Sequence, residues 1–297
     1  MLHRVLAGLL VGAVWLAALR FMPGWMLFLV MAAMSGICQA EFYKMLSAGR
    51  TRFSCSSAWG ISLGTLWLAW CYAVSPPVAA AAGGFLPQAS VPVLVSLVGV
   101  FLARVLFMKQ DRPVEYAAVT LLGFFYLPVM FTFLIRIAQW GANGYAQIAP
   151  DRTGIYLALF VAAVVKFNDV GGFAFGIPFG KHKLIPQVSP KKSWEGMFGG
   201  FLFAILVSLL LTWLAHTYAW VPGGPLKTLP YPAAAVLGVV LALVGLFGDL
   251  VESRIKRDAD TKDSSVLLPG LGGILDMFDS LVFAPAVFYL FLQLAKF

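Results

Sequence analysis

The chain has 297 residues, of which 61% are hydrophobic and only 11% are charged, and its mean hydropathy is +0.87. A soluble globular domain carries about 25% charged and about 45–50% apolar residues. The composition therefore excludes a soluble enzyme, a disordered chain and a secreted disulfide scaffold, and it predicts an all-α, polytopic membrane protein. The net charge of +8 is also a property of nucleic-acid-binding proteins, so the positions of the basic residues must decide between these partners.

A membrane-spanning helix needs about 20 consecutive, mostly apolar residues. Nine such runs are predicted, at residues 5–22, 24–43, 58–74, 91–108, 115–135, 153–169, 197–219, 233–251 and 277–295. The first run resembles a signal peptide, but Arg20 ends it without a small-residue cleavage site and another span follows at once. We divide the chain into an N-terminal region of about five spans, residues 1–152, and a C-terminal catalytic region of about four spans and two polar segments, residues 153–297.

The basic residues are distributed unevenly between the two ends of these spans. With nine spans, one side of the membrane holds only Arg20, Arg136, Arg152, Lys227 and Lys296, and the other side holds the rest of the 21 basic residues. Cytoplasmic loops carry an excess of Lys and Arg, so we place the N-terminus in the cytoplasm. Because the basic residues orient the chain and face phosphates in this interpretation, we expect no nucleic-acid partner.

More than half of the 13 acidic residues lie close together near the C-terminus: Asp249, Glu252, Asp258, Asp260, Asp263, Asp276 and Asp279. On one continued helix, the spacing of Asp249, Glu252, Ser253, Lys256, Asp260 and Asp263 would place them on one face. The alternative is a solvated juxtamembrane loop, which we prefer for Asp258 and Asp260.

Three aspartates in this region are candidates for a metal site. Asp249 directly follows an apolar run, where a carboxylate is costly unless it faces a polar cavity or a cation. Asp276 and Asp279 begin the last span with i,i+3 spacing, after the glycine-rich turn at 269–273. We expect Asp249, Asp276 and Asp279 to surround one divalent cation, and oxygen ligands favour Mg²⁺.

A second polar segment, residues 166–196, contains glycines and clustered lysines. Glycines let backbone N–H groups approach phosphates, and lysines neutralise them, so this segment could hold a polyphosphate. Its candidate substrate-binding residues are Asn168, Asp169, Lys181, Lys183, Ser189, Lys191, Lys192 and Ser193. An ordinary cytoplasmic loop explains the lysines equally well on composition alone, but Asp169 ends a span and is the better candidate for a ligand.

The sequence of the C-terminal segment resembles the signature of the phosphatidate cytidylyltransferase (CDP-diacylglycerol synthase) family. The matching positions are Ser253, Lys256, Arg257, Lys262, Asp263, Pro269, Gly270, Gly272, Gly273, Asp276 and Asp279. Residues 168–196 are similar to a second conserved region of that family. Residues 41–43 match a weaker feature at the end of the second span, where we predict an ion pair between Glu41 and Lys44.

The resemblance implies an enzyme that makes CDP-diacylglycerol and pyrophosphate from CTP and phosphatidic acid in a lipid bilayer, as a homodimer in the bacterial inner membrane, with its active site facing the cytoplasm. In that family picture Asp249 and Asp276 hold Mg²⁺ with a K⁺ ion beside it, and Asp279 and Asp263 support that site. The other implied catalytic or substrate-binding residues are Ser253, Lys256, Arg257, Lys262, Gly270, Gly272 and Gly273. The alternatives are a lipid or anionic-solute transporter and a related CTP-dependent lipid kinase.

Two positions depart from the family signature, and they generate a prediction. Leu271 stands where the family usually has His, and Met277 stands where it usually has Arg. If these losses remove phosphate contacts, Leu271→His and Met277→Arg will raise the rate of CDP-diacylglycerol formation or broaden the range of lipids accepted. Initial rates with a panel of phosphatidic acids test this, and an unchanged rate and lipid preference would show that both departures are neutral.

Overall fold

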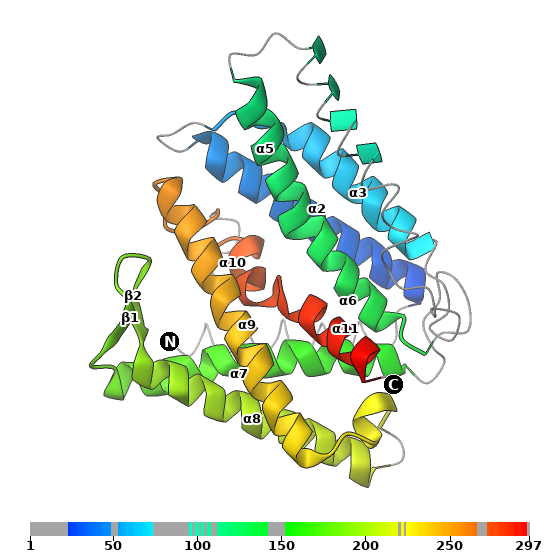
Figure 1. The fold of residues 1–297 in the computed structure, drawn as a ribbon, viewed down its shortest axis with the longest axis vertical. Coiled ribbons are helices and arrows are strands. Elements are labelled where there is room, and N and C mark those ends of the chain that lie inside the picture. The colour runs from blue at the N-terminus through cyan, green and yellow to red at the C-terminus, as the bar shows by residue number, and fades with distance from the viewer. Residues whose placement is uncertain are drawn as a thin grey trace. The chain divides into compact units, whose positions relative to one another are not determined.

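The computed structural model describes residues 23–48, 53–73, 112–141, 152–218, 221–222, 224–265 and 272–295, with four short pieces between 95 and 107 (Figure 1). It divides into two compact units. Unit 1 comprises Met1–Ala149 and Asp258–Met277, and unit 2 comprises Pro150–Arg257 and Phe278–Phe297. The segment that carries the C-terminal signature is therefore shared between the two units.

Unit 1 is built from long apolar helices. These are α2 (Gly24–Ala48), α3 (Ser57–Ala73) and a 26-residue helix made of α5 (Pro113–Phe124), a π-helical turn η2 (Phe125–Val129) and α6 (Met130–Ala138). Tyr43 of α2 is 1% exposed, and its hydroxyl donates to the Thr120 carbonyl at 2.7 Å. Its ring lies against Gly60 and Gly123, where any Cβ would overlap it. Glycines at these two positions thus let α2, α3 and α5 pack closely.

Unit 2 contains the remaining elements in chain order: α7 (Thr153–Phe179), β1 (Lys183–Ile185), β2 (Ser189–Ser193), α8 (Trp194–Thr217), η3 (Gly224–Lys227), α9 (Tyr231–Asp258), η4 (Asp279–Leu281) and α11 (Ala284–Leu294). The helix α10 (Ile274–Phe278) leads from unit 1 into η4. The strands β1 and β2 form an antiparallel hairpin that pairs Lys183 with Ser193. This hairpin joins α7 to α8, which lie side by side (Figure 1).

Glycines on facing sides of α7 and α8 allow this close packing. A Cβ at Gly171 would lie 2.5 Å from the carbonyl oxygen of Gly199, and a Cβ at Gly196 would lie 2.8 Å from that of Gly172. Gly171 and Gly172 lie inside α7, where backbone N–H groups bond within the helix, so these glycines bring two membrane helices together. The expected approach of glycines in residues 166–196 to a phosphate stays a prediction.

Six described helices are long and apolar enough to span a membrane, which indicates a multi-pass membrane protein that is nearly all-α. They correspond to predicted runs 24–43, 115–135, 153–169, 197–219, 233–251 and 277–295. The predicted run 58–74 coincides with α3, which has 17 residues. The run 5–22 lies outside the described residues, and so does most of 91–108.

Two helix ends differ from the sequence-based expectation. The helix α7 continues beyond Asp169 to Phe179. The helix α9 ends at Asp258, and Asp260 has a left-handed φ of +53°. A left-handed residue cannot continue a right-handed helix, so Asp260 and Asp263 do not share the helical face of Asp249. The expected single face therefore holds only as far as Lys256.

The glycine packing predicts a stability change for Gly171→Ala. Its Cβ would meet a backbone oxygen that cannot move without shifting α8. Overpacking of this kind costs about 1–3 kcal/mol. The apparent Tm of the detergent-solubilised protein should fall, whereas Gly36→Ala should leave it unchanged, because a Cβ there would meet its nearest atom at 3.9 Å. Equal Tm values for both variants would contradict the packing explanation.

Candidate active site

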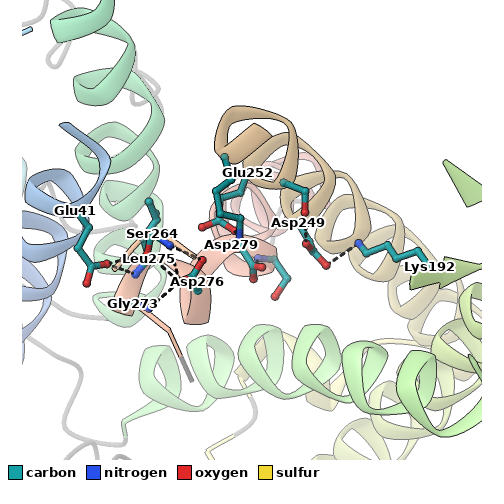
Figure 2. A network of polar contacts seen from close by, with 12 residues as sticks. Glu41, Lys192, Asp249, Glu252, Ser264, Gly273, Leu275, Asp276 and Asp279 are labelled. Carbon is teal, nitrogen blue, oxygen red and sulfur yellow. Dashed lines mark hydrogen bonds and ion pairs between the residues drawn. The ribbon is translucent and has the colours of Figure 1, made fainter. Parts of the chain in front are cut away.

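Three carboxylates of unit 2 form an acidic cluster: Asp249, Glu252 and Asp279, each offering an oxygen within 4.8 Å of the others. Asp249 and Glu252 lie one helical turn apart on α9, and Asp279 begins η4 (Figure 2). The close approach of η4 to α9 depends on Gly248, where a Cβ would lie 2.5 Å from the carbonyl oxygen of Asp279. A glycine beside Asp249 therefore permits the acidic cluster to form.

Lysines neutralise the two carboxylates on α9. The Nζ of Lys192, on β2, lies 2.6 Å from Oδ2 of Asp249. The Nζ of Lys256 lies 2.8 Å from Oε2 of Glu252, one turn earlier on the same helix. Ser253 donates from Oγ to the other oxygen of Asp249 at 3.2 Å. Hydrogen-bonded ion pairs of this kind offset the cost of removing the charges from water.

Asp279 belongs to a second polar group that reaches α7. Lys166 Nζ lies 4.0 Å from Oδ1 of Asp279 and 3.4 Å from Oδ2 of Asp169. The same ammonium donates to Ser280 Oγ at 2.8 Å, and Ser280 Oγ donates to Asp169 at 2.9 Å. Lys166 therefore ties the start of η4 to the middle of α7.

The residues present in this cluster fit a divalent metal ion. The donors are all carboxylate oxygens, which suit a hard cation such as Mg²⁺. The side chain of Glu252 is only 1% exposed, and those of Asp249 and Asp279 are 25% and 15% exposed. With Asp169 included, four carboxylates face three lysines. Three carboxylates this close together favour the binding of a cation.

A pocket of about 240 Å³ opens beside the acidic cluster within unit 2. It is lined by Asn168, Asp169, Gly172, Phe173, Leu184, Lys191, Lys192, Ser193, Gly196, Met197, Leu246 and Asp249. Two lysines of the hairpin therefore share one cavity with Asp169 and with Asp249 of the acidic cluster. Ammonium groups and carboxylates that could hold a metal, placed around one cavity, are the chemistry that a metal–polyphosphate complex requires.

The hairpin positions its lysines through a helix cap. Ser193 ends β2 and is the N-cap of α8, where its Oγ accepts a hydrogen bond from Gly196 N at 3.2 Å. It is 3% exposed, so this hydroxyl has a structural role as well as a place in the pocket wall. The cap fixes the direction in which the chain leaves β2, and with it the position of Lys192 beside Asp249.

Other candidate residues of the hairpin segment lie away from the pocket lining. Lys181 and Lys183 are exposed, and Ser189 is half-buried at the start of β2. His182 contacts Glu195, with Nδ1 at 2.7 Å from Oε1. Within the described part of the chain, none of these residues lines the pocket.

Asp276, which the sequence predicts as a metal ligand, lies in unit 1. Its Oδ2 accepts hydrogen bonds from Gly273 N at 2.7 Å and from Ser264 N and Oγ at 2.9 Å. Gly272 has a φ of +88°, which glycine adopts without strain. Asp276 thus closes the turn that precedes α10, and its place in a metal shell stays a prediction.

The remaining signature residues lie near the end of α9. Arg257 is exposed in the last turn of α9, and Lys262 and Asp263 are exposed in the segment that follows. Gly270 and Leu271 lie outside the described residues. The catalytic roles expected for Arg257, Lys262 and Asp263 therefore stay predictions.

Three residues near these sites were not among the sequence-based candidates. Glu252 and Lys166 each lie three positions from a candidate aspartate, so helical spacing alone could have identified them. Glu41 is different, because it contacts Ser264, Ser265 and the N-terminus of α10. Among the described residues it makes no ion pair with Lys44, so the predicted pair is wrong.

Comparison with known proteins finds similar bacterial sequences. The chain is 39% identical over 140 residues to YnbB of Escherichia coli, a protein described as uncharacterized, which covers 47% of this chain and 43% of that protein. It is 37% identical over 140 residues to the phosphatidate cytidylyltransferase of Mycobacterium bovis, which covers 47% of this chain and 42% of that one. For the phosphatidate cytidylyltransferase of Staphylococcus epidermidis, the values are 39% over 153 residues, 50% and 54%.

The chain spans about half the length of the curated relatives it matches. The model of the family described as "Cytidylyltransferase family" matches a much larger part, residues 2–295. Since this match covers nearly the whole chain, the chain belongs to the cytidylyltransferase family.

Proposed function

We propose that this protein is a membrane phosphatidate cytidylyltransferase, which converts CTP and phosphatidic acid into CDP-diacylglycerol and pyrophosphate. The family match and two similar bacterial relatives, both named phosphatidate cytidylyltransferase, support this proposal. The observation that carries it is the pairing of Lys192 with Asp249 at 2.6 Å in the wall of the unit 2 pocket. Lysine is a common phosphate ligand, and here Lys192 contacts the acidic cluster, which could hold a metal, at the wall of one cavity.

The reaction needs little proton chemistry from the protein. The phosphate of phosphatidic acid is already anionic at neutral pH, so its oxygen attacks the α-phosphorus of CTP without a general base. A new P–O bond joins the lipid phosphate to the cytidylyl group, the bond from the α-phosphorus to the bridging oxygen breaks, and pyrophosphate leaves with the bonding electrons. Catalysis then depends on positioning and on neutralising charge.

Different residues of unit 2 would position CTP and neutralise its charge. Lys191 and Lys192 lie on the hairpin side of the pocket and would bind phosphate oxygens of CTP. Asn168 and Asp169 line the same cavity from α7, where they would contact the rest of the nucleotide. The exposed contact between His182 and Glu195 keeps the one histidine of the hairpin segment occupied, in agreement with a reaction that needs no histidine base.

Asp249, Glu252 and Asp279 would hold the metal ion, which we propose is Mg²⁺, with a K⁺ ion beside it. The sequence-based assignment of Asp276 to the metal site, and of Lys256, Arg257, Lys262 and Asp263 to phosphate neutralisation and support, forms part of the same proposal. When bound, the cation neutralises charge on the triphosphate and on the departing pyrophosphate. Lys192, which pairs with Asp249 at the pocket wall, would also reach a phosphate oxygen of CTP in that pocket.

The proposed membrane arrangement has nine spans, with the N-terminus and the active site facing the cytoplasm of a bacterial cell and the protein in the inner membrane. The uneven distribution of Lys and Arg supports it, since cytoplasmic segments carry more of these residues. CTP would then enter from the cytoplasm and phosphatidic acid from the bilayer. The family resemblance is the sole support for a homodimer.

Product analysis with labelled CTP and phosphatidic acid tests the proposed activity. Wild-type membranes should form CDP-diacylglycerol and release pyrophosphate. Asp249→Asn should reduce this rate by at least about 100-fold, because it removes a charge from the metal cluster. Asp258→Asn, the same change at an exposed position at the end of α9, should retain the wild-type rate.

The products also separate the alternatives. Release of CDP with phosphorylation of a lipid would identify a CTP-dependent lipid kinase. Movement of lipid or anionic solute without any consumption of CTP would identify a transporter. A wild-type rate in Asp249→Asn would refute the assignment of Asp249 to the metal site while leaving the overall activity established.

Gly248→Ala tests whether the distance between α9 and η4 matters for the reaction. Its Cβ would push the Asp279 backbone away from α9 and so move one carboxylate of the cluster. Misplacement by about 1 Å can cost about 100-fold in rate. We expect a lower kcat and a higher Mg²⁺ concentration for half-maximal rate, with Gly36→Ala as the control that changes neither. If Gly248→Ala needs no more Mg²⁺ than wild type, Asp279 does not bind the metal.

A further inference from the structure

Glu41 has a buried carboxylate that the proposed reaction does not use. It lies on α2 and is 5% exposed. Its oxygens accept hydrogen bonds from Ser265 Oγ at 2.6 Å, Leu275 N at 2.8 Å, Ile274 N at 3.2 Å and Ser264 Oγ at 3.3 Å. These donors lie at the two described stretches Ser264–Ser265 and Ile274–Leu275. Because a buried carboxylate is costly without such partners, the contact constrains both sides.

Ser264, one of the donors to Glu41, and Gly273 hold Asp276 in place. Asp276 accepts hydrogen bonds from Gly273 N and from the backbone and hydroxyl of Ser264. Ser264 Oγ lies within hydrogen-bonding distance of both Glu41 and Asp276, at 3.3 and 2.9 Å. A hydroxyl carries one proton, so it donates to one carboxylate at a time and links the two. Figure 2 shows Glu41, Ser264 and Asp276 converging on the start of α10.

Glu41 contacts the turn before α10 directly, and no residue larger than glycine fits at position 273. A Cβ at Gly273 would lie 2.6 Å from Oε2 of Glu41. Glycine at this position therefore lets the backbone of the turn approach the carboxylate closely. The two backbone N–H groups that Glu41 binds, at Ile274 and Leu275, are the first donors of α10 and have no partner within a helix of that length.

The helix that carries Glu41 is itself firmly held. Gln39 Nε2 donates to the Gly60 carbonyl at 2.9 Å, and Tyr43 donates to the Thr120 carbonyl at 2.7 Å. Both contacts are buried and lie two positions on either side of Glu41. The carboxylate thus projects from a part of unit 1 that buried hydrogen bonds hold, and it contacts the residues that begin α10.

We infer that Glu41 is a positioning residue for the proposed reaction, because its carboxylate fixes the segment that carries Asp276 without itself touching substrate. This inference rests on the proposed function, in which Asp276 belongs to the metal site. Residues that orient metal ligands through hydrogen bonds typically change metal affinity or activity by about 10–100-fold when they are replaced. Glu41 therefore acts on the reaction from the N-terminal half of the sequence.

Glu41→Gln tests the inference, since Gln has nearly the same shape but turns an NH₂ group toward donors. Hydrogen–deuterium exchange of the purified protein should show faster exchange at residues 274–275 and unchanged exchange in α7 and α8. The kcat should fall by about 10–100-fold, with a higher Mg²⁺ concentration for half-maximal rate and an unchanged KM for phosphatidic acid. Lys44→Gln, an exposed change one turn along α2, should match wild type in all three.

Ser265→Ala provides a second variant in case Glu41→Gln does not fold. It removes one of the hydrogen bonds to Glu41 and should change exchange and kcat in the same direction but by less. Wild-type exchange at residues 274–275 in both variants would overturn the inference. So would faster exchange with an unchanged kcat, which would make Glu41 purely structural. A reduced kcat without faster exchange would also overturn it, because Glu41 would then act on substrate directly.

The two proposals can fail separately. If the wild-type protein forms no CDP-diacylglycerol, the proposed function fails. The exchange of the 274–275 amides in Glu41→Gln then still decides whether Glu41 holds the segment, because that measurement needs no substrate.

Discussion

Carboxylates on apolar helices are stable only where cations or hydrogen-bond donors meet them, and unit 2 is organised around this constraint. Asp249 and Glu252 lie on α9, a helix of 28 residues, and each meets a lysine ammonium within 3 Å, at 2.6 and 2.8 Å. The lysines that serve the acidic groups come from α7, from the hairpin and from α9 itself. Neutralising these charges therefore holds three separate elements around one pocket.

In the proposed function, the same arrangement binds a metal–nucleotide complex. The carboxylate oxygens of the acidic cluster lie within 4.8 Å of one another, so the cluster attracts a cation. Lys192 links the acidic cluster to the pocket, because it pairs with Asp249 and also lines the pocket. The closely packed glycines hold α7 and α8 together, and the hairpin that carries Lys192 joins these two helices. The packing of small residues thus helps to place the charged residues of the site.

Sequence patterns predict those features that depend on neighbouring residues. Apolar runs located the six long helices, and the spacing of Asp249 and Glu252 already placed them on one face. The end of α9 was missed because the left-handed φ of Asp260 breaks a periodic pattern that continues in the sequence. The partners of Glu41 were missed because Ile274 lies 233 positions away, and an ion pair with Lys44 was the only local possibility. Contacts over such distances in the chain leave no trace in local spacing.

Direct measurement of metal binding tests whether Asp249, Glu252 and Asp279 form the proposed metal site. Titration of the purified, detergent-solubilised protein with Mn²⁺, followed by the loss of the free-ion paramagnetic resonance signal, measures binding without substrate. We expect one saturable site in the wild-type protein, abolished by Mg²⁺ competition and lost in Glu252→Gln. Unchanged Mn²⁺ binding in Glu252→Gln would contradict it.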